Sequence, residues 1–207
     1  MAPSHHTLTS PPLSLRHEFV RKALHLSAAV FPIAYSLGAQ RNTLEMFLAI
    51  ISAFAILTEA LRRANATVSA AFERAFGSLI RQHERRSITG ATWLAVSCLV
   101  AVMVLSRNAA IAALWCAAVG DPVATIAGRV WSTSGAAKSG EKGGKTMMGS
   151  LACAAASFVG VWMLAGYSPA TAAVIAAGAA VAEAMPTRID DNVRVTSVAG
   201  AIAQFLA

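Results

Sequence analysis

The dominant pattern in the chain is a series of long apolar runs separated by short polar stretches. A helix that crosses a membrane needs about 20 apolar residues, within a range of roughly 17 to 25. Five runs reach this range, a sixth is shorter and largely alanine, and a seventh has only 13 residues. The runs are Ala23–Ala39, Leu44–Leu61, Ile88–Leu105, Ala109–Val130, Met147–Ala165, Ala170–Met185 and Val195–Ala207. They predict an all-α, polytopic membrane helix bundle with about seven transmembrane helices.

The two ends of the chain depart from this pattern. Residues 1–15 are polar and rich in proline, which predicts a mobile N-terminal tail ahead of a single transmembrane domain at residues 16–207. The run Val195–Ala207 is below the usual spanning length. It fits a short tilted span, a re-entrant segment or a packed cap, and the sequence leaves these three alternatives open.

The distribution of basic residues predicts how the chain is oriented. Of the 17 Lys and Arg residues, all except Arg41 and Arg107 lie in the N-terminal stretch or in alternate loops, on one predicted side. Positively charged loops stay in the cytoplasm, so we expect a cytoplasmic N-terminus. If all seven runs cross, the C-terminus lies outside. In a bacterium the protein would occupy the inner membrane, with its active site on the cytoplasmic side.

Composition narrows the class of protein. Hydrophobic residues make up 56% of the chain and charged residues 13%, against about 25% charged in soluble domains. These values exclude a soluble globular protein and a disordered one. The net charge of +7 is spread over every loop on one side, which argues against a nucleic-acid partner. Cys98, Cys116 and Cys153 lie within apolar runs and are predicted to be packing residues.

The longest loop, between the second and third runs, carries its own apolar period. Val68, Phe72, Phe76 and the pair Leu79/Ile80 recur every three to four residues, with charged residues between them. This spacing predicts an amphipathic interfacial helix on the inner membrane surface. A helix packed on neighbouring protein loops explains the pattern equally well.

Asp121 is the most unusual charge in the chain, because it lies well inside an apolar run. Charged residues in spanning segments are costly and often functional. Gly120 and Pro122 flank it, and proline disfavours continuation of a helix, so we expect the fourth span to break there. Asp121 is a candidate metal ligand or catalytic carboxylate. The alternative is a helix-capping aspartate paired with a nearby arginine.

The segment 132–150 combines glycines, lysines and hydroxyl residues. Glycine-rich backbone can present N–H groups to phosphates, and lysine adds positive charge. The segment is not a Walker loop, because Ser139 stands where the first glycine is required. A triphosphate cradle and a flexible cytoplasmic loop are both compatible with it.

Two further polar clusters lie at the same predicted end. Asp190, Asp191 and Asn192 supply oxygen ligands suited to Mg²⁺, or form an acidic turn that caps the last helix. Arg21 and His25 lie four residues apart on one helical face, beside Lys22. This set could hold a lipid head group, with His25 as a general base, or it could consist of topology charges.

Taken in order, these motifs resemble the family of CTP-dependent lipid-alcohol kinases, which includes dolichol kinase, phytol kinase and the yeast-type diacylglycerol kinase. The similarity runs from about Arg16 to Asn192. Its motifs are Arg21-Lys22-x-x-His25, Glu59-x-x-Arg62, Glu84 with Thr89-Gly90-x-Thr92, Gly120-Asp121-x-x-Ala124-x-x-x-Gly128-Arg129, Lys145-Thr146-x-x-Gly149-Ser150, Glu183-x-x-Pro186 and Asp190-Asp191-Asn192.

The resemblance implies transfer of the γ-phosphate of CTP, with a divalent metal, to the hydroxyl of a membrane lipid alcohol. It places Gly120, Asp121, Gly128, Arg129, Lys145, Thr146, Gly149 and Ser150 at the nucleotide site, and Asp190, Asp191 and Asn192 nearby as candidates for holding the metal. The glycine- and lysine-rich segment adds Lys138, Gly143 and Gly144 as further nucleotide candidates. From the chemistry of the residues, Asp121 is a further metal candidate, Asp121, Asp191 and His25 are candidates for catalysis, and Arg21, Lys22, Glu59 and Arg62 are candidates for the lipid head group. Met148 departs from the pattern, because many members carry Glu there.

Two other classes compete with this interpretation. A phosphatidate cytidylyltransferase uses the same nucleotide but attacks the α-phosphate, and the long C-terminal signature of that family is absent here. A small transporter or scaffold should show an internal repeat and polar groups near the membrane midplane, and only Asp121 approaches the midplane. The lipid alcohol, the choice between CTP and ATP, and the oligomeric state are left open.

Overall fold

The computed structural model describes residues 15–80, 82–85, 87–133, 145–187 and 189–207, and these form helices without any strand. The predicted all-α class is therefore confirmed for the described part of the chain. The elements are α1 Leu15–Leu26, η1 Ser27–Ala29, α2 Val30–Ser36, α3 Arg41–Ala64, α4 Ala66–Phe76, η2 Gln82–Arg85, α5 Gly90–Val104, α6 Arg107–Trp115, η3 Cys116–Gly120, α7 Asp121–Thr133, α8 Met147–Leu164, α9 Pro169–Ala184 and α10 Asp191–Phe205. The predicted tail lies almost wholly outside the described residues.

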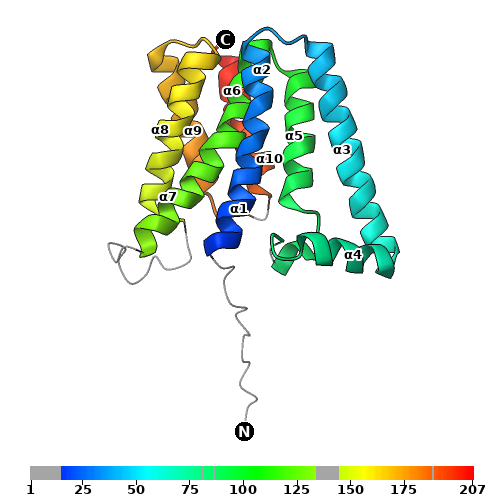
Figure 1. The fold of residues 1–207 in the computed structure, drawn as a ribbon. Helices are drawn as coiled ribbons and strands as arrows, with labels where there is room; N and C mark the ends of the chain where they lie inside the picture. The colour runs from blue at the N-terminus through cyan, green and yellow to red at the C-terminus, as the bar shows by residue number, and fades with distance from the viewer. Residues whose placement is uncertain (1–14, 81, 86, 134–144, 188) are drawn as a thin grey trace.

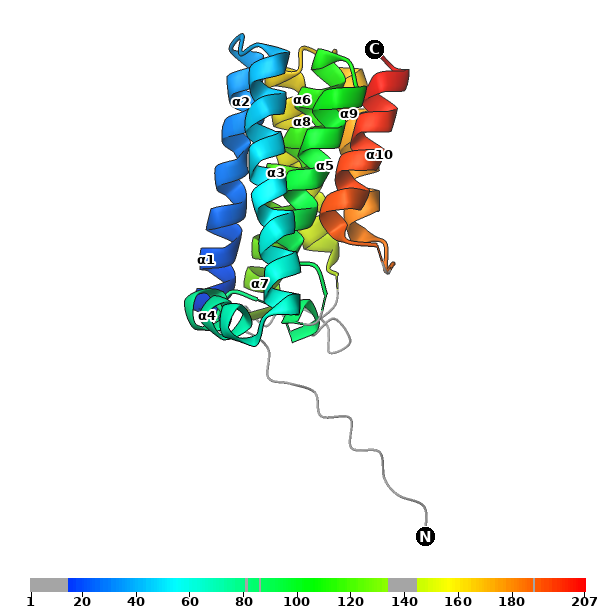
Figure 2. The ribbon, with the colours of Figure 1, turned by 90° about the vertical axis from the view of Figure 1, so that its right-hand side faces the viewer.

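Apart from α4, the helices stand side by side, and successive ones run in opposite directions (Figures 1 and 2). We call each traverse of the bundle from one end to the other a pass: α1 and α2 form one pass and α6, η3 and α7 form another, while α3, α5, α8, α9 and α10 are single helices. Every predicted apolar run corresponds to one of these passes. Three stretches are long and apolar enough to cross a membrane, namely Arg41–Ala64, Arg107–Ser132 and Met147–Leu164.

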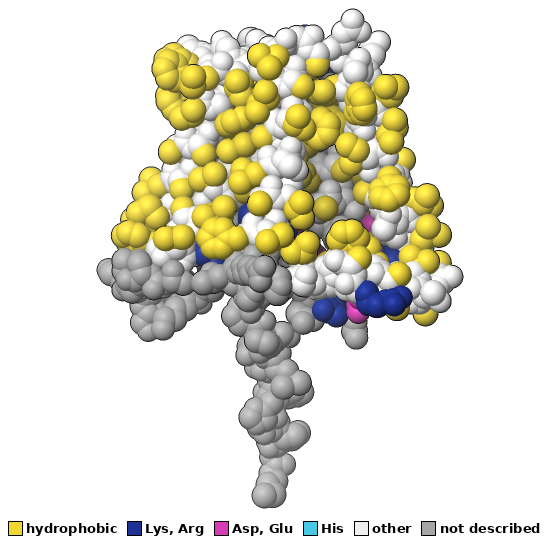
Figure 3. All heavy atoms as spheres, in the orientation of Figure 1, with side chains coloured by type: hydrophobic (Ala, Val, Ile, Leu, Met, Phe, Trp, Pro, Cys, Tyr) yellow, Lys and Arg dark blue, Asp and Glu magenta, His cyan; other side chains and the backbone are white. Residues whose placement is uncertain are grey.

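The core of the bundle is built from small residues around the pass that contains α6. Ala109, Ala110, Ala112 and Ala113 of α6 are fully buried. Small side chains let helix backbones approach closely, which is how helices pack where lipid provides no hydrophobic driving force. Large apolar side chains instead cover the outside of the bundle (Figure 3), as at Phe54 of α3 and Met163 of α8. This inverted distribution suits a chain surrounded by lipid.

The predicted helix break at Asp121 is wrong. The chain stays helical from Arg107 to Thr133, and η3 is a π-helical turn. The Asp121 N–H donates to the carbonyl of Cys116, five residues earlier. Such π turns often occur at functional sites. Asp121 has helical backbone angles and is therefore a helical residue rather than an N-cap.

The loop between α3 and α5 contains the expected helix, α4, which lies crosswise under one end of the bundle (Figure 1). The Asn65 side chain begins it by accepting hydrogen bonds from the N–H groups of Thr67 and Val68. The guanidinium of Arg62 lies 5.3 Å from the centre of the Phe72 ring, which ties α4 to α3. We call this end of the bundle the α4 end and the opposite end the Arg41 end.

The last helix is longer than its apolar run. α10 begins at Asp191 rather than near Val195, and it packs against α5, α6 and α9. Val195, Ala199 and Ala203 are fully buried along its length. The segment thus forms a packed helix that runs alongside the other helices of the bundle (Figure 2).

Candidate functional site

Two cavities open at the α4 end, and they meet at Asp191. The first, which we call the α4 cavity, has a volume of about 460 Å³ and is bounded by α1, α3, α4 and α5. The second, the α10 cavity, has a volume of about 760 Å³ and lies beside the loop before α10. Asp191 lines both of them. This side chain therefore joins two compartments that could each hold one reactant.

The α4 cavity combines an apolar wall with a charged end. Phe54 of α3 and Phe72, Phe76, Leu79 and Ile80 of the α4 region supply the wall. The charged end contains Arg21, Lys22, His25, Glu59, Glu84, Asp121, Asp191 and Asn192. A ligand with an apolar body and one polar end has the chemistry that fits such a space.

A buried ion pair lies at the charged end of the α4 cavity. Lys22 Nζ is 2.6 Å from Asp121 Oδ2, and the two side chains are 2% and 1% exposed. The other carboxylate oxygen, Oδ1, is buried and has no hydrogen-bond partner within the described part of the chain. The predicted alternative of a capping aspartate paired with an arginine is wrong, because the partner is a lysine and the residue is not a cap. Buried polar atoms nearly always have a hydrogen-bond partner, so this oxygen is an unusual feature of the site.

His25 is fixed by the π turn before Asp121. Its Nε2 lies 3.1 Å from the carbonyl oxygen of Ala117. In the π register that oxygen would accept from the N–H of residue 122, but Pro122 has none. The Asp121–Pro122 pair therefore does not end the helix. It leaves the Ala117 carbonyl without a backbone donor, and the His25 ring of α1 donates to that carbonyl instead.

Two carboxylates hold the beginning of α5. Glu59 Oε1 accepts from the N–H of Thr89 at 2.8 Å, and Glu84 Oε1 accepts from the N–H of Gly90 at 3.1 Å. Negative charge at a helix N-terminus is stabilising. A Cβ on Gly90 would lie 3.2 Å from Glu84 Oε1, which explains a glycine there. Glu59 therefore stabilises the N-terminus of α5 and also lines the α4 cavity.

Arg62 holds the neighbouring loop together. It donates to Glu59 and to the backbone carbonyls of Glu84, Arg85 and Ser87. Arg62 is absent from the described lining of both cavities, whereas Arg21, Lys22 and Glu59 line the α4 cavity. Of the four residues predicted for a lipid head group, Arg62 is thus placed as a support for the loop.

The Asp190–Asn192 turn connects α10 with α5. Asp190 caps α10, since its Oδ1 accepts from the N–H of Asn192 at 3.0 Å. The Asn192 amide donates to the Gly90 carbonyl and to Asp190, which leaves Asn192 Oδ1 buried without a partner in the described residues. Burial and the neighbouring Asp191 carboxylate raise the pKa of Asp190 to about 6.

No group of three or more His, Cys, Asp or Glu side chains among the described residues is arranged to hold a metal ion. Asp190 and Asp191 nevertheless both line the α10 cavity. The turn therefore presents two neighbouring carboxylates to this cavity, without a third described His, Cys, Asp or Glu beside them.

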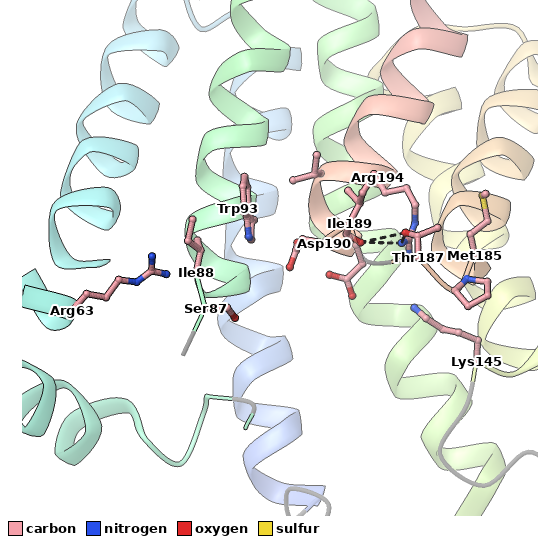
Figure 4. A pocket seen from close by; sticks show the side chains of 13 residues that line it. Arg63, Ser87, Ile88, Trp93, Lys145, Met185, Thr187, Ile189, Asp190 and Arg194 are labelled. Carbon is pink, nitrogen blue, oxygen red and sulfur yellow. Dashed lines mark hydrogen bonds between the residues drawn. The ribbon is translucent and has the colours of Figure 1, made fainter. Parts of the chain in front are cut away.

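Lys145 faces the α10 cavity from the start of α8, opposite Arg63 and Trp93 (Figure 4). It forms an ion pair with the buried Glu183 of α9. The lining residues Arg63, Ser87 and Trp93 are additions that the sequence motifs did not predict. Lys138, Gly143 and Gly144, which were predicted for the nucleotide, lie outside the described residues.

The other predicted nucleotide residues lie mostly in the contact between the α6–α7 pass and α8. A Cβ on Gly128 would lie 2.7 Å from Thr146 Oγ1, and a Cβ on Gly149 would lie 2.8 Å from the carbonyl oxygen of Ala124. Gly120 similarly approaches Ser157. These glycines are explained by close helix packing, and the described linings of the two cavities do not contain them. Small residues four or eight apart on facing helices are the sequence signal for this role.

Thr146 and Ser150 also have local roles. Thr146 Oγ1 accepts from the N–H of Gly149 at 3.1 Å and so caps α8. The Ser150 hydroxyl donates to the Thr146 carbonyl at 3.4 Å. Arg129 is half-buried on α7, and its side chain is absent from the described linings of the two cavities. Among the predicted nucleotide residues that the structure describes, Lys145 is the one that lines the α10 cavity, and Asp121 lines the α4 cavity.

The three buried cysteines are free thiols, as their positions in apolar runs predicted. None of the family models, curated proteins or solved structures compared with this chain matches it.

Proposed function

We propose that this chain is an integral-membrane lipid kinase that transfers the γ-phosphate of CTP, or of another nucleoside triphosphate, to the hydroxyl of a lipid alcohol. The acceptor is a phytol, polyprenol, dolichol or diacylglycerol type of lipid. The observation that carries the proposal is the meeting of an apolar-walled cavity and an open, charged cavity at Asp191. Such an arrangement brings a lipid hydroxyl and a soluble phosphate donor to one point.

The acceptor belongs in the α4 cavity. Its hydroxyl would lie at the charged end near Lys22, His25 and Asp121, and its tail would follow the wall of Phe54 and Phe72. The cavity is recessed between the α1–α2 pass and α3 on a surface rich in apolar side chains (Figure 3). A lipid could therefore enter sideways from the bilayer without leaving it.

The nucleotide belongs in the α10 cavity, where Lys145 and Arg63 supply positive charge. Phosphoryl transfer needs positioning and charge neutralisation more than covalent groups. Asp190 and Asp191, which both line this cavity, fit Mg²⁺, since this ion favours oxygen ligands and is usually held by one or two carboxylates plus substrate phosphates. When bound, the ion would neutralise phosphate charge, while Lys145 orients the triphosphate.

The proposal includes an orientation in the membrane. All seven passes would cross, with the α4 end in the cytoplasm and α4 lying in the interface with its apolar side chains toward the lipid. The N-terminus would then be cytoplasmic and the C-terminus outside. Reporter fusions at each terminus test this orientation, and reporters on the same side would contradict it.

The decisive experiment uses CTP with different labels on its α- and γ-phosphates. The purified protein in detergent is incubated with Mg²⁺ and a lipid-alcohol extract, and the lipids are then extracted and separated. We expect only the γ-label in the lipid fraction, and the mobility of the product identifies the alcohol. The α-label in the lipid would instead indicate a cytidylyltransferase. If neither label enters the lipid and ATP is also inactive, the protein is not a kinase for the alcohols in the extract.

A further inference from the structure

The orientation of the His25 ring is set by a backbone feature of another helix. A carbonyl oxygen can only accept a hydrogen bond, so His25 Nε2, which lies 3.1 Å from Ala117 O, must carry the proton. The acceptor is available because Pro122 lacks the N–H that the π turn would direct to it. The π turn and the proline thus select one tautomer of the imidazole.

The second ring nitrogen, Nδ1, is the basic one in this tautomer. No hydrogen bond to Nδ1 occurs among the described residues, and the His25 side chain is partly exposed. His25 lines the α4 cavity together with Lys22 and Asp121. A positioned nitrogen lone pair therefore lies at the charged end of the space proposed for the lipid alcohol.

We infer that His25 is the general base of the reaction and takes the hydroxyl proton of the lipid alcohol on Nδ1, while the Ala117 carbonyl holds the ring in place through Nε2. This inference rests on the proposed kinase function. It assigns to the π turn and Pro122 the role of a positioning device.

The O–H bond of the alcohol breaks and its proton goes to His25 Nδ1, which becomes imidazolium. The alcohol oxygen forms a bond to the γ-phosphorus, and the bond from that phosphorus to the β–γ bridging oxygen breaks. The nucleoside diphosphate leaves with the electron pair. The Asp121 carboxylate lies close enough to His25 to stabilise the imidazolium electrostatically, and Lys22 offsets part of that effect.

The test separates a base from a structural histidine. In His25→Gln the side-chain amide can still donate to Ala117 O, but no basic nitrogen replaces Nδ1. We expect kcat to fall by about 100- to 10,000-fold, the range for loss of a general base, with KM for CTP unchanged. Ser27→Ala, an exposed change in the segment after α1, is the matched control and should keep the wild-type rate.

Chemical rescue supplies the second readout. In His25→Ala the removed ring leaves space beside a cavity of about 460 Å³, so added imidazole should restore turnover, and more basic imidazoles should restore more. Pro122→Ala returns an N–H to Ala117 O and should lower kcat by less than His25→Gln does. Unfolding curves of all variants identify any that fail to fold.

Each outcome has one meaning. Loss in His25→Gln together with rescue of His25→Ala supports the base. Wild-type turnover in His25→Gln, or loss without any rescue by imidazoles, overturns it. A wild-type protein that transfers no label to any lipid instead rejects the kinase proposal, so the two failures are distinguishable.

Discussion

The two ends of the bundle use charged residues in opposite ways. At the Arg41 end, Arg41 donates to the carbonyls of Val102 and Leu105 at the end of α5. Arg107 donates to the Tyr35 carbonyl and lies 4.6 Å from the centre of the Tyr35 ring. The basic groups there close helix ends, whose last carbonyls lack intrahelical partners.

At the α4 end the charges instead border cavities. Lys22 and Asp121 pair in the interior, and the buried oxygens Asp121 Oδ1 and Asn192 Oδ1 lack partners among the described residues. A buried polar group without a partner costs stability. The Arg41 end also contains one such atom, Ser106 Oγ, but Ser106 lies outside the described linings of both cavities, whereas Asp121 and Asn192 line the α4 cavity. The comparison therefore shows that unpartnered polar atoms at a cavity, rather than charge alone, distinguish the α4 end.

The largest expected effect comes from Asp121→Asn. This variant leaves Lys22 buried without a counter-charge, and breaking such a pair costs about 3–5 kcal/mol. We also expect phosphate transfer to fall by at least about 100-fold, as for removal of one electrostatic group from an active site. Unfolding in detergent and the label-transfer assay measure the two effects.

The double variant Lys22→Met/Asp121→Leu separates these effects. It replaces the ion pair with apolar side chains, which often restores stability. We expect a folded but inactive protein. Wild-type transfer by the double variant would make the pair purely structural and remove the contrast between the two ends.

Lys145→Met should have the next largest effect. A hydrogen bond to a charged group contributes roughly 1.5–3 kcal/mol, so KM for the nucleotide should rise about 10- to 100-fold. Stability should also fall, because the lost ion-pair partner, Glu183, has a side chain that is only 4% exposed, so KM is measured on the folded fraction. Lys145→Arg, which keeps the charge, is the control. An unchanged KM in Lys145→Met would show that the nucleotide does not bind in the α10 cavity.

Gly149→Ala tests whether a predicted nucleotide glycine is a packing residue. The new Cβ would lie 2.8 Å from the Ala124 carbonyl oxygen, and overpacking typically costs about 1–3 kcal/mol. We expect a lower unfolding temperature, with KM for the nucleotide unchanged in the folded fraction. Ser150→Ala, one residue later, should be nearly neutral. Normal stability together with a raised KM would instead show that Gly149 contributes to nucleotide binding.

The smallest effect is expected at the Arg41 end. Arg41→Met removes the donor to the α5 carbonyls and should cost about 1–2 kcal/mol. Specific activity of the folded protein should stay at the wild-type value, because this side chain is remote from both cavities. A loss of activity without a loss of stability would show that the two ends are not functionally separate.

Much of the helical layout could be predicted from local sequence. The run Met147–Ala165 matches α8, Met147–Leu164, almost to the residue, and the period of Phe72 and Phe76 anticipated α4. The Asp-Pro pair was misjudged, because a π turn can absorb a proline that an α-helix would not. The glycines of the lysine motif were likewise assigned to phosphate, although their surroundings require them for helix contact.

The sequence by itself determined the all-helical class, the order of the passes and the gathering of basic residues in alternate loops, because each depends on residues near one another in the chain. The tertiary structure alone decided that Lys22 meets Asp121, 99 residues away, and that His25 reaches Ala117, 92 residues away. Those contacts depend on how each helix is rotated about its axis and how closely it approaches its neighbours. Small side chains and one π turn set both quantities, and no local pattern encodes the result.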